Sequence, residues 1–87
     1  MRIDYSKKFI KQLKKAPISV KNNFQKRLQT FSKNKKDPVL NNHKLKGKLK
    51  GFRSINITGD YRAIFKELDN GDLIFFFMLG THSELYQ

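Results

Sequence analysis

The spacing of apolar residues changes along this chain, and the change restricts the possible folds more than any other feature. Val20, Phe24, Leu28 and Phe31 recur at steps of four, four and three, which is the spacing of one face of an α-helix. From Phe52 onward apolar and polar residues alternate instead, as they do in a half-buried β-strand. A helical segment followed by strands predicts an α+β fold.

The first part of the chain predicts a helical hairpin. Ser6 is a candidate N-cap for a helix over about 7–15. Pro17 ends this helix and suits the first turn of a second one, over about 17–33. Residues 2–5 alternate in polarity, so we expect a short edge strand before the hairpin.

The second part predicts three strands, over residues 52–57, 61–68 and 73–79. Asn70-Gly71 supplies the positive φ angles of a type I′ turn, which predicts a tight hairpin between the last two strands. Gly80 is expected to end the final strand. Thr81 and Glu84 then have the spacing of a capping box, which predicts one short turn of helix.

These elements predict a single small α+β domain over residues 1–87, in the order β-α-α-β-β-β, with the helical hairpin packed on one face of an antiparallel sheet. The side chains expected to face the helices are Ile55, Ile57, Ala63 and Phe65. The opposite face then carries a polar set, Ser54, Asn56, Arg62 and Lys66. Arg53, at the end of its strand, fits either face.

Positive charge is concentrated in one half of the chain. The formal net charge is +12, yet residues 1–50 carry a net +14 and residues 51–87 a net −2. Charge of this size indicates a polyanionic partner such as nucleic acid, an acidic protein or an anionic membrane, although a lysine-rich surface also serves solubility alone. Six lysines lie in an irregular connection over residues 35–51, which we interpret as functional or as a basic loop without a role.

Several classes of protein are excluded by composition. The chain has no Cys, so it has no disulfide, thiolate metal site or thiol nucleophile, and we expect it in the cytoplasm. Its first residues lack the apolar run of a signal peptide. The longest apolar run, 73–79, is far shorter than the ~20 residues that span a bilayer.

Two histidines, His43 and His82, are the main candidates for chemistry. A pair of imidazoles can serve as general base and general acid near neutral pH, and nearby cations can stabilise a phosphate in the transition state. This combination suits metal-free cleavage of RNA, whose 2′-hydroxyl is the nucleophile that DNA lacks. A histidine in a loop is often without function, and no Cys or acidic cluster accompanies these two for a metal site.

Three motifs follow one another in the second half: His43-x-Leu45-x-Gly47-x-Leu49-x-Gly51-x-Arg53, Ile55-x-Ile57-x-x-Asp60-Tyr61-Arg62 and Gly80-Thr81-His82-x-x-Leu85-Tyr86. In this series the chain resembles the RelE/ParE toxin superfamily, and within it most of all the YafQ-type toxins. The motifs cover about half of the chain, and the order of elements covers nearly all of it. The resemblance implies a RelE-like fold and a ribosome-dependent mRNA endonuclease, the toxin of a type II toxin–antitoxin pair.

The resemblance also implies roles for individual residues. His43 and His82 would be the proton-transfer pair, with base and acid unassigned. Asp60 would orient or tune a neighbouring histidine, Arg62 would bind the scissile phosphate, and Tyr86 would stack on or position a base. Secondary contacts with the substrate would come from Arg53, Lys46, Lys48 and Lys50. The implied partners are mRNA, the ribosome and an acidic antitoxin, and no cofactor or metal is expected.

The chain departs from this pattern at two positions. Asn56 stands where YafQ-type chains often have a further histidine, and Tyr61 stands where they favour tryptophan. Asn cannot shuttle a proton at neutral pH, so the two remaining imidazoles gain importance. Two other functions stay open: a ParE-like gyrase poison, and a basic nucleic-acid-binding module without catalysis. Arg62, Asp60 and Tyr86 also have purely structural interpretations, as a solvated strand residue, a turn residue and a packing residue.

Overall fold

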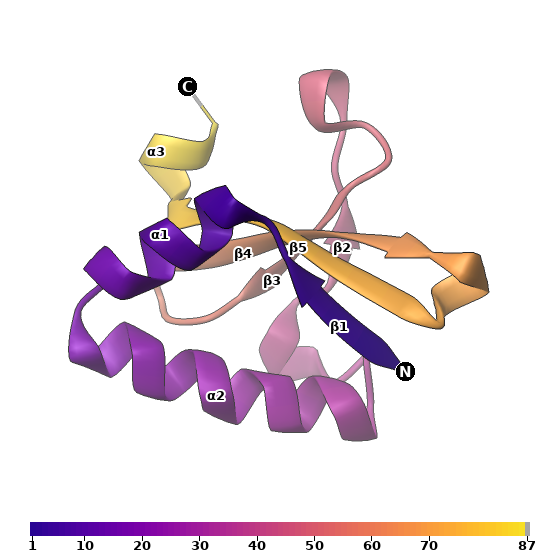
Figure 1. Ribbon diagram of the computed structural model, residues 1–87, viewed down its shortest axis with the longest axis horizontal. Coiled ribbons are helices and arrows are strands. Elements are labelled where there is room, and N and C mark those ends of the chain that lie inside the picture. Colours follow the sequence, from indigo (N-terminus) through magenta and orange to yellow (C-terminus); the bar gives the residue numbers. More distant parts are fainter. Residues whose placement is uncertain (87) are drawn as a thin grey trace.

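Residues 1–86 are described by the structure, a computed structural model (Figure 1). The strands are β1 (Arg2–Tyr5), β2 (His43–Lys44), β3 (Arg53–Asn56), β4 (Tyr61–Leu68) and β5 (Leu73–Thr81). The helices are α1 (Lys7–Lys15), α2 (Ile18–Lys33) and α3 (His82–Leu85). Three 3₁₀ turns, η1 (Pro38–Leu40), η2 (Gly47–Leu49) and η3 (Asp69–Gly71), complete the order. The α+β fold and its order of main elements are confirmed.

The sheet is mixed, in the strand order β1-β5-β4-β3-β2. Strands β3, β4 and β5 pair antiparallel, as expected, and the unpredicted β2 pairs antiparallel with β3. Strand β1 instead pairs parallel with β5, from Arg2 opposite Leu73 to Tyr5 opposite Phe76. The expectation of a wholly antiparallel sheet was therefore wrong for this one pair. Alternation of polarity fixes which face a side chain occupies but carries no information on strand direction.

The core lies between the sheet and α2, which runs beneath the sheet in Figure 1. Phe24 and Phe31 of α2 are buried against Phe65 and Phe76 of the sheet, with ring centroids 5.3 to 6.5 Å apart. The predicted helix-facing residues all belong to this core: Ile55, Ile57, Ala63 and Phe65. The face assignment made from alternation is thus confirmed, and the other face of the sheet is free of α2.

Helix α1 covers the part of β5 that β1 does not reach. It begins at the predicted N-cap, because Ser6 Oγ accepts a hydrogen bond from the Phe9 N–H at 2.9 Å. The same hydroxyl donates to the Phe77 carbonyl at 2.7 Å, and Gln12 Oε1 accepts from the Leu79 N–H at 2.8 Å. These two side chains form hydrogen bonds with backbone groups at the edge of β5 that would otherwise be unpaired.

The expected hairpin between β4 and β5 is confirmed, with the predicted positive φ at Asn70 and Gly71 and a further one at Asp69. Two other local expectations were wrong. The connection over residues 35–51 is not wholly irregular, because it contains β2, which pairs with β3. Gly80 does not end β5, and a Cβ there would lie 3.3 Å from Glu84 and Leu85, so glycine lets α3 pack closely on the strand.

Within residues 1–86 no helix has both the length and the apolar character needed to cross a membrane.

Candidate active site

A cleft lies between α3 and the β2–β3 hairpin. Figure 1 shows that α3 and the loop of this hairpin both rise from the side of the sheet opposite α2. The volume of the cleft is about 380 Å³. The lining residues come from the hairpin, the sheet and α3: Asn41, His43, Leu45, Ser54, Arg62, His82 and Tyr86. The structure therefore brings together both histidines with the predicted arginine and tyrosine, from positions that lie far apart in the sequence.

His43 enters the cleft from β2 with one ring nitrogen already engaged. Its Nδ1 lies 2.7 Å from the carbonyl oxygen of Asn41. Asn41 has a left-handed backbone (φ 46°), a conformation that Asn tolerates better than most residues, and this turn aims the carbonyl at the ring. Since a carbonyl can only accept a hydrogen bond, Nδ1 carries the proton. In the neutral ring Nε2 is then a free acceptor.

His82 is the first residue of α3, and a capping box holds this short helix in place. The Thr81 hydroxyl accepts from the Glu84 N–H at 3.2 Å, and the Glu84 carboxylate accepts from the Thr81 N–H at 2.8 Å. These hydrogen bonds to Thr81 lower the pKa of Glu84. The His82 N–H donates to the Asp60 carbonyl at 3.1 Å, which ties the helix start to the turn before β4.

Tyr86 lies one helical turn after His82, and the two rings are in contact. Their centroids are 4.7 Å apart at an interplanar angle of 52°. Tyr86 remains exposed enough, at 37%, to offer surface to a second aromatic group. The tyrosine therefore restricts the His82 ring and still presents a surface in the cleft.

Arg62 lies on the floor of the cleft, on β4. Its Nη1 donates to the carbonyls of Thr58 at 2.9 Å and Tyr61 at 3.1 Å. Within residues 1–86, Nε and Nη2 make no hydrogen bond. A guanidinium fixed at one nitrogen with other donors unused is suited to an anionic oxygen.

A match to a protein-family model over the whole length of the chain identifies its family. The family model described as "Bacterial toxin of type II toxin-antitoxin system, YafQ" matches residues 1–87. The chain belongs to the YafQ family.

Solved structures agree with membership of the YafQ family. Escherichia coli YafQ is 30% identical over the full length of both chains, with a TM-score of 0.72. A metal-bound toxin from Helicobacter pylori is 33% identical, with 99% of each chain covered and a TM-score of 0.76. A YoeB/ParE toxin from Agrobacterium tumefaciens shares the fold alone, at 13% identity over 94% of this chain and 99% of that one, with a TM-score of 0.78. A search of curated proteins found no match.

Asp60, expected from the YafQ-type motif to act on a histidine, contacts His82 through its main chain. Its carbonyl holds the His82 amide, while its exposed carboxylate is outside the residues that line the cleft. Among the hydrogen bonds within residues 1–86, none joins this carboxylate to an imidazole. The role of the Asp60 side chain stays a prediction, with no contact in this structure that supports it.

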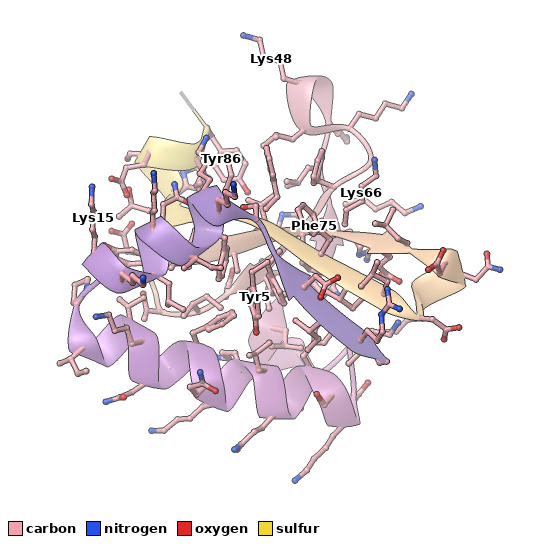
Figure 2. All side chains as sticks on the ribbon, in the orientation of Figure 1. Tyr5, Lys15, Lys48, Lys66, Phe75 and Tyr86 are labelled. Carbon is pink, nitrogen blue, oxygen red and sulfur yellow. The ribbon has the colours of Figure 1, made fainter. Side chains whose placement is uncertain are left out.

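Arg53 points away from the cleft. Its Nε donates to Asn42 Oδ1 at 2.8 Å and lies 3.8 Å from Glu67 Oε1, on the side of the sheet that bears α2. With Lys46 and Lys50 it lines a second cavity of about 670 Å³, on the other side of the hairpin. Lys48 projects into solvent from η2, at the top of Figure 2.

Three residues of the cleft carried no predicted role: Asn41, Leu45 and Ser54. Ser54 had a detectable signal, because alternation places it on the same face as Arg62. Its hydroxyl is fully buried and has no hydrogen-bond partner within the described part of the chain. Asn56 Oδ1, at the position where the YafQ pattern has histidine, is also buried without a partner in that part of the chain.

Residues 1–86 contain no group of three or more His, Cys, Asp or Glu side chains that could hold a metal ion.

Proposed function

We propose that this YafQ-family chain is an endoribonuclease that cuts mRNA on the ribosome and so inhibits translation. The observation that carries the proposal is the single cleft that holds two imidazoles, a guanidinium and an aromatic ring. One histidine can take the proton of the attacking 2′-hydroxyl and the other can protonate the leaving 5′-oxygen, and arginine is suited to the phosphate itself. The positive charge of residues 1–50 supports docking on ribosomal RNA.

In this mechanism His43 is the base and His82 the acid. His43 Nε2 takes the proton of the 2′-hydroxyl, because Nδ1 is held protonated by the Asn41 carbonyl. The 2′-oxygen forms a bond to phosphorus as the bond from phosphorus to the 5′-oxygen breaks. His82 gives its proton to that leaving oxygen. The products are a 2′,3′-cyclic phosphate and a 5′-hydroxyl.

Arg62 stabilises the charge that grows on the non-bridging oxygens of the phosphate during this step. Tyr86 positions a neighbouring base, and the Asp60 main chain fixes the start of α3 and thereby His82. No divalent metal enters the chemical step, because the two imidazoles supply both proton transfers. Arg53, Lys46, Lys48 and Lys50 bind RNA outside the cleft.

An acidic antitoxin is the proposed protein partner, and the cytoplasm the proposed place of action. A solved complex of Escherichia coli DinJ and YafQ contains a chain 30% identical to this one over the full length of both, with a TM-score of 0.71. A partner of opposite charge would bind the basic half of this chain and inhibit it by covering the cleft or the surface that docks on RNA.

The test uses translating ribosomes and an mRNA with one 2′-deoxy nucleotide at the cut position as the matched control. We expect cleavage of the all-ribose mRNA with 2′,3′-cyclic phosphate ends, and no cleavage at the deoxy position. His82→Ala and His43→Ala should each reduce the cleavage rate by at least about 100-fold, whereas the exposed α3 neighbour Ser83→Ala should not.

Intact mRNA in the wild-type reaction would overturn the proposal. Breaks in DNA linked to gyrase would favour a ParE-like poison instead, and ribosome binding without any cleavage would favour a binding module. Cleavage that leaves a 3′-hydroxyl and a 5′-phosphate would exclude the 2′-hydroxyl mechanism.

A further inference from the structure

Two phenylalanine rings lie stacked on the side of the sheet that carries the cleft. Phe52 and Phe77 have ring centroids 5.1 Å apart at an interplanar angle of 29°, and both are partly exposed. Phe77 is the extra residue of a β-bulge, because Ile64 pairs with Met78 and Phe65 with Phe76. Neither ring belongs to the buried core beneath the sheet.

Each ring has a lysine ammonium over it. Lys8 Nζ lies 5.8 Å from the centroid of Phe77, and Lys66 Nζ lies 5.4 Å from that of Phe52. Both lysines are exposed, and Figure 2 shows Lys66 on the side of the sheet away from α2. An exposed cation–π contact is weak, so a ligand can displace the ammonium at little cost.

The ring pair adjoins the candidate active site. Phe52 directly precedes β3 and is two residues from Ser54, a separation of about 7 Å in extended chain. The Phe52 carbonyl accepts a hydrogen bond from the Leu45 N–H at 3.0 Å, and Leu45 and Ser54 both line the cleft. A strand of RNA that leaves the cleft in this direction therefore passes over the rings.

Rings flanked by cations match the chemistry of single-stranded nucleic acid. Every base has a flat face that can stack on an aromatic side chain, and each base is followed by a phosphate. We propose that Phe52 and Phe77 form a stacking platform for RNA bases beside the cleft, with Lys8 and Lys66 moving off the rings to bind the adjacent phosphates. The proposal rests on the proposed function, since it concerns the RNA that the cleft would cut.

The test compares two short strands of equal length and charge. One is oligodeoxyadenylate, which the wild-type protein cannot cut because it lacks the 2′-hydroxyl, and the other is the same backbone without bases. Binding is measured by fluorescence anisotropy. The wild-type protein should bind the strand with bases more tightly than the strand without them. The double variant Phe52→Leu with Phe77→Leu should bind the strand with bases about tenfold more weakly and the strand without bases as the wild type does.

Two matched variants control this result. Phe75→Leu changes a partly exposed ring on the same strand that makes no ring or ammonium contact within residues 1–86, so affinity should be retained. Lys8→Gln with Lys66→Gln should weaken binding of both strands by a similar factor. Circular dichroism of each variant verifies the fold. If the leucine variant misfolds, Phe52→Tyr with Phe77→Tyr replaces it. This tyrosine variant should keep the preference for the strand with bases.

Equal affinity of the wild-type protein for the two strands would overturn the platform, and so would an unchanged preference in the leucine variants. If those variants bind both strands normally but lose affinity for an acidic antitoxin, the rings are a protein interface instead. Cleavage of mRNA by the wild-type protein is measured separately. The platform can therefore fail while the proposed nuclease function stands.

Discussion

Ser54 buries a hydroxyl, without a partner in residues 1–86, directly opposite His43 in the β2–β3 pair. Such a group costs about 1–3 kcal/mol in folding free energy. Ser54 is among the residues that line the cleft, but its hydroxyl has no exposed surface that a substrate could contact. The hydroxyl therefore lowers stability without offering a hydrogen bond to the substrate.

Ser54→Ala should therefore leave the free energy of unfolding unchanged or raise it by up to about 1 kcal/mol, because the unpartnered hydroxyl is removed. The same change should leave kcat/KM for mRNA cleavage unchanged, because the buried hydroxyl has no surface for the substrate. Thermal unfolding and cleavage rates measure the two quantities. Ser32→Ala, exposed on α2, is the control. Lower stability of Ser54→Ala would mean that the hydroxyl has a partner in the folded chain, and slower cleavage would give it a role in the site.

At the scale of the element, α3 has only four residues and depends on its cap. A helix this short is not stable in isolation, because nucleation outweighs the few hydrogen bonds gained. The Thr81–Glu84 capping box and the packing of Leu85 against Gly80 therefore hold both His82 and Tyr86 in the cleft. The capping box was predictable from sequence because its partners lie three residues apart.

The cap should weaken in acid. Hydrogen bonds from Thr81 lower the pKa of Glu84 below its ordinary value of 4.5, so the carboxylate stabilises α3 above that value. This stabilisation is lost as the pH falls through the lower, folded-state pKa. NMR of the Thr81 amide should report the loss in the wild-type protein, while Glu84→Gln should shift that amide at neutral pH and remove its acid transition. An acid transition that survives in Glu84→Gln would assign it to another group.

Sequence patterns predicted the elements in which apolar residues recur at regular spacing and missed the element that is too short to show such spacing. The bounds of α1 and β4 agree with expectation, since caps and alternation mark their ends. Strand β2 consists only of His43 and Lys44, so no period exists to detect. The cleft itself combines distant segments. The substrate role of Arg53 was expected from the resemblance alone, and its orientation could not be predicted because it depends on contacts with Asn42 and Glu67.

At the scale of the whole molecule, the basic half of the chain occupies both sides of the sheet. Lys46, Lys48 and Lys50 lie on the hairpin beside the cleft, whereas Lys26 and Lys33 lie on α2 at the opposite side (Figure 1). In the proposed complex with RNA, the cleft would face the RNA, so the hairpin would lie toward the phosphates and α2 away from them. Net charge alone does not distinguish these two surfaces.

Salt dependence of ribosome binding distinguishes them. Replacement of Lys46, Lys48 and Lys50 by Gln should flatten the slope of log affinity against log salt by about 0.7–0.9 for each phosphate that the variant no longer neutralises. Lys26→Gln with Lys33→Gln, the matched control on α2, should change the slope much less. A larger change from the α2 variant would make α2 the docking surface.

The hydrogen bonds that Ser6 and Gln12 make to β5 also have a consequence for the folding pathway. Strands β3, β4 and β5 are neighbours in sequence and can assemble early, whereas β1 and α1 must return across some 70 residues to meet β5. Until they do, the apolar run Leu73–Leu79 stands at an open sheet edge, where it can recruit another chain. The docking of α1 thus sets how long a folding intermediate stays prone to aggregation.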